Sequence, residues 1–218
     1  MNLAGFVPLS LCDYPGRVAA VVFTQGCNFR CPFCHNGHLL TCAPDPATRL
    51  DEEQVLALLA ERRGRLGGVV VSGGEPTVQH DLPLFLRRLK ALGLAVKLDT
   101  NGSRPETLRA LLAEGLLDYI AMDVKAPWSK YATLTGVACD VAAVRTSLEL
   151  IASSQVPHLF RTTRVDPLLT APDYRDLLTQ IPHASAHVWQ PFRAMYSHDP
   201  ALRAAAEAGA THAHAKKM

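Results

Sequence analysis

The chain has 218 residues, of which 48% are hydrophobic and 19% charged, and its formal net charge is +2. This length and composition fit one globular domain with a full hydrophobic core, so we treat residues 1–218 as a single domain. The small net charge, with no basic run beyond Lys216 and Lys217, argues against nucleic acid or an anionic membrane as the partner.

Short β-branched runs alternate with segments of helical period from residue 18 onward. This alternation predicts an α/β fold in which βα units surround a parallel sheet. We expect the domain core at about 16–195 and a C-terminal helix or tail at 198–218. The six expected strands are Val18–Phe23, Gly68–Val71, Ala95–Leu98, Tyr119–Met122, His158–Thr162 and His187–Gln190.

The segments between these strands have helical apolar stripes and recognisable boundaries. Asp51 and Ser103 are expected N-caps, because their side chains can accept a hydrogen bond from the first helical turn. Glycine ends the first three helices, as it often does. The expected helices run from Asp51 to Gly64, from about Asp81 to Gly93, from Ser103 to Gly115, from about Asp140 onward, and through alanine-rich Ala201–Ala215.

No basic stretch precedes an apolar one at the amino terminus, and no apolar run approaches the roughly 20 residues that span a bilayer. We therefore expect a cytoplasmic protein with no membrane partner. A reducing compartment also favours metal ligation by cysteine over disulfide bonds.

Three cysteines occur in the segment 24–36 with the spacing C-x3-C-x2-C, namely Cys27, Cys31 and Cys34. Three soft thiolates on one loop can bind an iron–sulfur cluster and leave one iron free to hold a substrate or cofactor. The other cysteines lie outside this spacing and receive no role; they are Cys12, Cys42 and Cys139.

Polar residues directly follow four of the expected strands: the cysteine loop, Ser72-Gly-Gly-Glu-Pro76, Asp99-Thr-Asn-Gly102 and Asp123-Val-Lys125. The carboxyl ends of parallel strands share one edge of the sheet, where ligands bind. Gly73 and Gly74 allow the backbone to approach a ligand closely, and Glu75 adds a carboxylate. A plain strand-to-helix turn is the alternative interpretation of these three residues.

Asp99 and Asp123 lie on neighbouring expected strands and could jointly hold a cation or orient a ligand amine. Lys125 supplies a positive group for a carboxylate or a ribose oxygen. A surface Asp–Lys pair is the alternative interpretation. Arginines also occur on or after the last two strands, and we assign no role to Arg161, Arg164 or Arg193.

Taken together, these motifs resemble those of the radical S-adenosylmethionine (SAM) enzymes, and within them the activating enzymes of glycyl radical enzymes. The likeness runs nearly end to end and is closest to the type that activates anaerobic ribonucleoside-triphosphate reductase. The residues that carry it are the cysteine motif, Gly5-Phe-Val-Pro-Leu-Ser10, Asp13-Tyr-Pro-Gly16 and Cys34-His-Asn36.

The resemblance implies a partial (β/α)6 TIM-like barrel in which the three motif cysteines hold a [4Fe-4S] cluster. SAM would chelate the fourth iron through its amino and carboxylate groups, with Phe33 against the adenine. Gly73, Gly74 and Glu75 would bind the methionyl amino group. Four further residues would lie close to SAM and a monovalent cation: Asp99, Thr100, Asp123 and Lys125.

The resemblance also implies the reaction and its partners. Reductive cleavage of SAM would give methionine and a 5′-deoxyadenosyl radical, which takes a hydrogen atom from a glycine Cα of a partner. The implied partner is a glycyl radical enzyme such as anaerobic ribonucleoside-triphosphate reductase, and the implied electron donor is a flavodoxin or ferredoxin. No side chain acts as a general base. Several activating enzymes carry additional Cys-x2-Cys runs, whereas residues 39–68 contain only Cys42, so no second cluster is expected.

Two other functions are also consistent with the sequence. One is a small-molecule radical SAM enzyme such as a 7-carboxy-7-deazaguanine synthase, which the Asp13-Tyr-Pro-Gly16 segment fits less well. The other is a non-catalytic zinc module that uses the three cysteines and His35. Because Cys34 and His35 are adjacent, they cannot easily both reach one tetrahedral ion.

Overall fold

The computed structural model describes residues 1–42, 49–166 and 168–204. The strands in this part of the chain form one sheet in sequential order from β1 to β7. Strands β2 to β7 run parallel to one another, and β1 pairs antiparallel with β2. Their bounds are β1 Leu3–Ser10, β2 Ala19–Thr24, β3 Gly68–Gly73, β4 Ala95–Thr100, β5 Tyr119–Asp123, β6 His158–Arg164 and β7 His187–Pro191.

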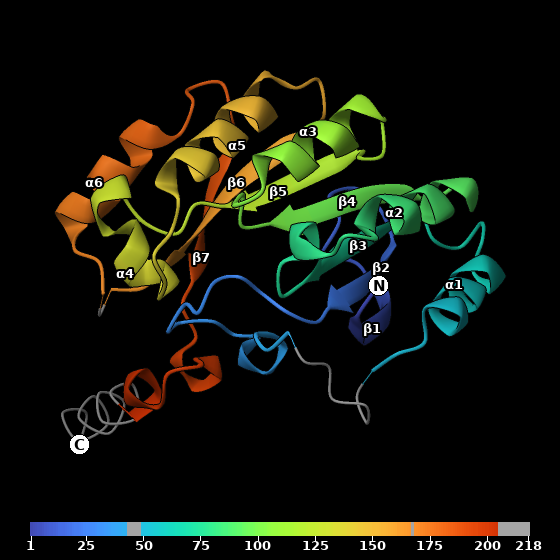
Figure 1. The fold of residues 1–218 in the computed structure, drawn as a ribbon, viewed down its shortest axis with the longest axis horizontal. Helices are drawn as coiled ribbons and strands as arrows, with labels where there is room; N and C mark the ends of the chain where they lie inside the picture. Colours follow the sequence, from blue (N-terminus) through green and yellow to red (C-terminus); the bar gives the residue numbers. More distant parts are fainter. Residues whose placement is uncertain (43–48, 167, 205–218) are drawn as a thin grey trace, which may run out of the picture.

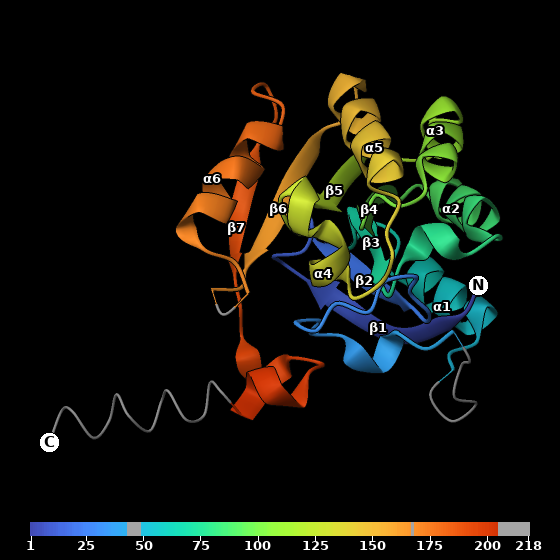
Figure 2. The same ribbon diagram turned by 60° about the vertical axis from the view of Figure 1, so that its left-hand side comes forward.

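Helices α2, α3, α5 and α6 follow one another along the outer face of the curved sheet (Figures 1 and 2). The first and last strands lie at opposite ends of the sheet and do not pair with each other, so the barrel is open. The predicted partial (β/α)6 barrel is confirmed. The helices are α1 Glu52–Glu61, α2 Leu82–Ala91, α3 Pro105–Ala113, α4 Tyr131–Thr135, α5 Val141–Ser153 and α6 Ala171–Gln180.

The central strands β2 to β5 are mostly buried on both faces, which explains why they read as nearly continuous apolar runs. Val69 and Val71 point into the main core beneath the helices, together with buried leucines of α2 and α3. Val70, between them, points to the opposite face and joins a smaller cluster with Tyr14 and Val21. That second face forms the inside of the open barrel.

Two of the predicted helix starts are confirmed in detail. The Asp51 carboxylate accepts a 3.0 Å hydrogen bond from the Gln54 amide, and Asp140 accepts one of 3.1 Å from the Ala143 amide.

The prediction of Ser103 as an N-cap is wrong: Arg104 occupies that position, and α3 begins at Pro105. The Ser103 hydroxyl instead accepts a hydrogen bond from Asn28.

Several elements of the structure were not predicted from the sequence. Strand β1 was not predicted, although its pairing with β2 extends the sheet on the amino-terminal side of the expected core. Helix α6 was also missed, despite a capping box between Thr170 and Asp173. Residues 200–204 are helical at the start of the expected last helix, whereas the remainder of that prediction, 205–218, lies outside the described residues.

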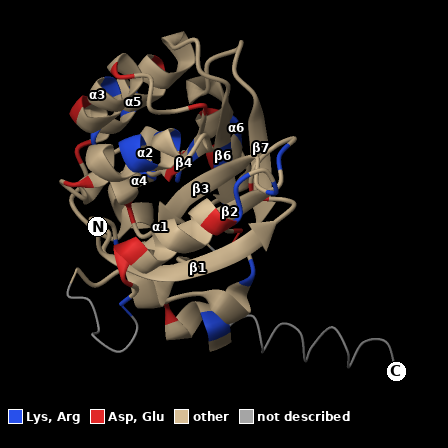
Figure 3. Cartoon of the chain, turned by 90° about the vertical axis from the view of Figure 1, so that its right-hand side faces the viewer, with Lys and Arg blue, Asp and Glu red and all other residues tan. Residues whose placement is uncertain are grey.

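Lys and Arg are interspersed with Asp and Glu on the view in Figure 3. Several oppositely charged side chains pair across helices, such as Arg87 with Glu114 and Arg88 with Glu53. In the part of the chain that is described, none of the helices combines the length and apolarity needed to cross a membrane.

Candidate functional site

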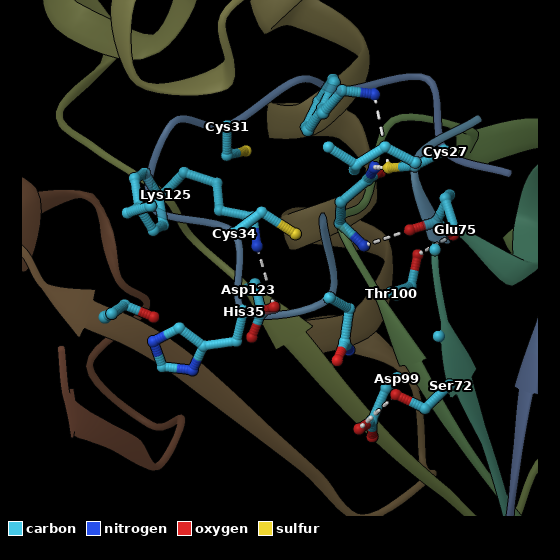
Figure 4. A pocket seen from close by; sticks show the side chains of 18 of the residues that line it. Cys27, Cys31, Cys34, His35, Ser72, Glu75, Asp99, Thr100, Asp123 and Lys125 are labelled. Atoms are coloured by element: carbon cyan, nitrogen blue, oxygen red, sulfur yellow. Dashed lines mark hydrogen bonds and ion pairs between the residues drawn. The ribbon is translucent and has the colours of Figure 1, made fainter. Parts of the chain in front are cut away.

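One pocket lies at the carboxyl ends of the parallel strands and contains the whole candidate site (Figure 4). Its wall includes every residue that the sequence analysis proposed for the cluster or for SAM: Cys27, Cys31, Phe33, Cys34, Gly73, Gly74, Glu75, Asp99, Thr100, Asp123 and Lys125. The structure therefore brings together motifs that are about 100 residues apart in the chain. Further residues line the same pocket, among them His35, Ser72, Asn101, Arg161, Thr163 and Gln190.

The cysteine loop follows β2 and is held by main-chain hydrogen bonds on both sides. The Gly26 amide donates to the Leu39 carbonyl at 2.8 Å, and the Arg30 amide donates to the Thr135 carbonyl at 2.7 Å. Gly136, just after Thr135, has a φ of 67° and sits so close to Arg30 that a Cβ would overlap the Arg30 carbonyl oxygen. Two neighbouring segments thus fix the loop before any ligand binds.

The three motif cysteines are free thiols whose sulfur atoms point into the pocket (Figure 4). Cys27 and Cys31 are buried and Cys34 is half-buried. Burial raises the pKa of the Cys27 thiol to about 12 and that of Cys31 to about 11. At neutral pH these thiols therefore stay protonated, and each loses its proton when a strongly positive group such as iron binds to the sulfur.

The three thiols on one loop of the pocket are the donor set that an iron–sulfur cluster takes. No group of three or more His, Cys, Asp or Glu side chains in residues 1–42, 49–166 and 168–204 gathers closely enough to hold one ion. A [4Fe-4S] cluster binds each thiolate to a different iron, so its ligands stand farther apart than those of a zinc ion. The His35 ring instead packs against Phe192 and Tyr196, with centroids 6.1 Å away in each case. The donor set of the three cysteines fits a cluster, and the packing of His35 between two aromatic rings argues against its use as a fourth zinc ligand.

Gly73 and Gly74 end strand β3 where it meets the start of the cysteine loop. Gly73 has a φ of 113°, and a Cβ there would lie 2.3 Å from the Thr24 nitrogen. A Cβ on Gly74 would lie 2.1 Å from the Gly26 oxygen. We expected a close approach to a ligand, and the structure shows a close approach of the chain to itself at residues that also line the pocket.

Glu75 is 1% exposed, and its carboxylate links two segments of the site. It accepts hydrogen bonds from the Thr77 amide at 3.0 Å, the Thr100 hydroxyl at 2.8 Å and the Asn101 amide at 2.6 Å, and also from the Thr77 hydroxyl. Burial raises the pKa of Glu75, although each donated hydrogen bond favours the charged form. Glu75 therefore joins the end of β3 to the end of β4.

We expect Glu75→Gln to lower the free energy of unfolding by about 1–3 kcal/mol, because the new amide NH2 would face donors in place of an acceptor. Denaturant titration of the apoprotein measures this change. Glu106→Gln is the matched control, since the Glu106 side chain is 82% exposed. An equal effect of the two substitutions would contradict the structural role of Glu75.

Asp99, Asp123 and Lys125 belong to a chain of ion pairs across the inside of the barrel. Lys125 Nζ contacts Asp123 at 2.9 Å, and Arg161 contacts Asp123 at 2.9 Å and Asp99 at 3.3 Å. Asp99 also pairs with buried Lys97. Burial alone would raise the pKa of Asp123, but Arg161 and Lys125 outweigh it and lower that pKa to about 2.

Two of the polar pocket residues that were not assigned from the sequence make contacts that matter for the site, Asn101 and Arg161. Asn101, buried at the end of β4, places Nδ2 4.0 Å from the Cys27 sulfur and 3.0 Å from Asn28 Oδ1. Its signal was its position in the run Asp99-Thr-Asn-Gly102. Arg161 was noted for its place on a late strand but received no role, because only the pairing of β6 with β5 places it directly opposite Asp123.

Comparison with known proteins identifies the family. The model of the radical SAM superfamily matches residues 21–170. A provisionally named glycyl-radical enzyme activating enzyme of Methanocaldococcus jannaschii is 32% identical over 206 residues, which cover 90% of this chain and 82% of that protein. A 7-carboxy-7-deazaguanine synthase of Methanopyrus kandleri is 33% identical over 132 residues, which cover 52% of each chain.

The fold comparison agrees with the family match. The solved structure of native anSMEcpe with bound AdoMet superposes with a TM-score of 0.59 at 16% identity, covering 78% of this chain and 49% of that one. This chain thus spans about half the length of the synthase and of the solved structure. With a matching family model over most of its length and the cysteine pocket in place, the chain is a radical SAM enzyme and belongs to the radical SAM superfamily.

Proposed function

We propose that this chain is an activating enzyme that uses SAM to install a glycyl radical on a partner enzyme. The observation that carries the proposal is the single pocket that joins the three motif cysteines to the polar ends of β3, β4 and β5. Similarity to the M. jannaschii protein over 90% of the chain supports the activating function over the synthase, whose match covers about half. When bound, a [4Fe-4S] cluster supplies the electron that cleaves SAM into methionine and a 5′-deoxyadenosyl radical.

The residues of the chain bind and orient in this proposal. Cys27, Cys31 and Cys34 hold the cluster, and Phe33, which is buried in the pocket wall, packs against the adenine. Their placement on a fixed loop holds the reacting groups close together, which is the main contribution of such a protein to the rate.

The methionyl part of SAM lies against the strand ends. The backbone of Gly73 and Gly74, with Glu75, binds its amino group, and Lys125 binds its carboxylate. Thr100 orients Glu75 through the 2.8 Å hydrogen bond between them. The buried walls exclude water, which protects a radical from side reactions.

The proposed partner is anaerobic ribonucleoside-triphosphate reductase, with a flavodoxin or ferredoxin as electron donor, in the cytoplasm. A backbone glycine of the partner must reach the pocket, and the open sheet supports such access. Within residues 1–42, 49–166 and 168–204, β7 is the last strand of the sheet, and its Gln190 lines the pocket, so a loop that approaches the outer side of β7 would meet the pocket wall directly. Arg161 already bridges the two carboxylates that were expected to hold the monovalent cation.

Anaerobic electron paramagnetic resonance tests the proposal. We expect the reconstituted protein, mixed with dithionite, SAM and the candidate reductase, to give a glycyl doublet that requires every component. A reductase in which the radical glycine is replaced by alanine is the control and should give no doublet. SAM cleavage without any radical on the reductase would favour a small-molecule reaction such as that of the synthase.

A further inference from the structure

Asp99 and Asp123 were expected to share a cation. In the structure, the cation between them is the side chain of Arg161. Arg161 Nε lies 2.9 Å from Asp123 Oδ1, and Arg161 Nη1 lies 3.3 Å from Asp99 Oδ2. The two remaining oxygens also contact ammonium groups, since Asp123 Oδ2 pairs with Lys125 and Asp99 Oδ1 pairs with Lys97. Each of the four carboxylate oxygens therefore already has a cationic partner.

The strand pairing explains how one arginine reaches both carboxylates. Arg161 on β6 is directly opposite Asp123 on β5, and Asp99 on β4 is opposite Ala121 on β5. These four positions share the inner face of the sheet, because residues two apart on a strand point the same way. The small Ala121 side chain between Asp99 and Arg161 lets the guanidinium extend across β5.

The local charge also disfavours an additional metal ion. Three cationic side chains, Lys97, Lys125 and Arg161, surround two carboxylates and leave a net positive charge. The Arg161 side chain is 16% exposed, and charges in such sheltered positions are weakly screened. A further cation would have to displace Arg161 from both carboxylates and would be repelled by the two lysines.

We propose that the guanidinium of Arg161 is the fixed cation between Asp99 and Asp123, so that this chain binds SAM without a monovalent metal ion. The proposal rests on SAM binding in this pocket. Arg161 is a positioning residue: it holds the two carboxylates together and keeps Asp123 against Lys125, which faces the pocket. Because the cation is part of the chain, no entropy is lost in recruiting it.

The test measures SAM binding to the reconstituted holoenzyme by anaerobic calorimetry in potassium, sodium or choline chloride at equal ionic strength. We expect the Kd of the wild-type protein to agree within about twofold in all three salts. In Arg161→Gln, the paired carboxylates lose their bridging charge, so binding in choline should weaken by about tenfold or more. Potassium should then restore most of this loss.

Two further variants distinguish a positioning role of Arg161 from a general loss of structure. Arg161→Lys keeps a positive charge and should bind SAM independently of the salt, with intermediate affinity. Arg164→Gln is the matched control, because Arg164 lies on the same strand but is exposed, pairs with Asp166 at 3.4 Å and lies over the Tyr174 ring, away from Asp99 and Asp123. It should bind SAM as the wild-type protein does.

The proposal is overturned if the wild-type protein needs potassium or sodium to bind SAM, or if Arg161→Gln binds equally well in choline. If Arg161→Gln does not fold, SAM binding by the wild-type protein and by Arg161→Lys in the three salts still shows whether a monovalent metal ion is needed. Failure of SAM binding in every salt would refute both this inference and the activating function. Binding that depends on the cation would refute this inference alone.

Discussion

Replacement of Cys31 by Ala is expected to abolish binding of the iron–sulfur cluster. Cys31 is buried, lines the pocket and occupies the middle of the three-cysteine motif. Two remaining thiolates leave two irons of a cube without a protein ligand. Because even the outer partners of metal ligands are worth about 10–100-fold in affinity, loss of a ligand should reduce affinity by more than about 100-fold. Iron analysis and the visible spectrum after anaerobic reconstitution measure this result.

Cys139→Ala is the matched control for this substitution. Cys139 is also a partly buried free thiol, but it lies outside the pocket. Its loss should leave iron content unchanged. An equal loss of iron from both variants would show that the cluster is not held by the motif cysteines. A colourless wild-type protein that contains one zinc ion would support the zinc module instead.

The central strands β2 to β5 could be predicted because a sheet covered on both faces requires apolar residues at successive positions. Val69, Val70 and Val71 show this directly, since they are buried on alternating faces. Strand β1 has no such signature: several of its residues are exposed, and it pairs on one side with β2. Its place in the sheet depends on that partner, which the local sequence does not specify.

Helix α6 and the start of α3 show two different reasons why helix boundaries were not predicted correctly from the sequence. The signal for α6 was present in the sequence, since Thr170 and Asp173 have the spacing of a capping box and Pro172 lies in the first turn, where a helix tolerates proline. Ser103 had the right residue type for a cap, but Asn28 from the cysteine loop binds its hydroxyl. A contact between residues 75 positions apart overrides a local preference.

The candidate site was easier to predict than its internal contacts. Polar residues after apolar strands identify the rim of the pocket, because the strands are parallel and their carboxyl ends coincide. The sequence does not show that Glu75 binds Thr100 and Asn101, or that Arg161 joins Asp99 to Asp123. These pairs depend on strand register, which is determined by long-range packing.

Gly74→Ala is expected to destabilise the protein and to impair cluster binding at the same time. The Gly74 amide donates to the Thr24 carbonyl at 2.9 Å, and the next amide, that of Glu75, donates to the Gly26 carbonyl at 2.9 Å. A Cβ on Gly74 would lie 2.1 Å from that Gly26 oxygen and 3.1 Å from the Leu39 oxygen. Both are backbone atoms, which cannot rotate away as a flexible side chain can.

The end of β3 and the start of the cysteine loop must therefore separate in Gly74→Ala, which moves Cys27 relative to the other two cysteines. We expect the free energy of unfolding to fall by about 3 kcal/mol or more, at the upper end for an added methyl group in a packed site. Denaturant unfolding of the apoprotein measures the stability, and iron content after reconstitution measures the effect on the cluster.

Gly67→Ala provides the comparison for Gly74→Ala. Gly67 lies just before β3, and a Cβ there would meet Arg17 Cβ at 3.5 Å, an ordinary van der Waals contact. Its stability should remain within about 1 kcal/mol of the wild-type value, with full iron content. If Gly74→Ala also keeps its stability and its iron, the close packing of β3 against the cysteine loop does not hold the cluster ligands in place.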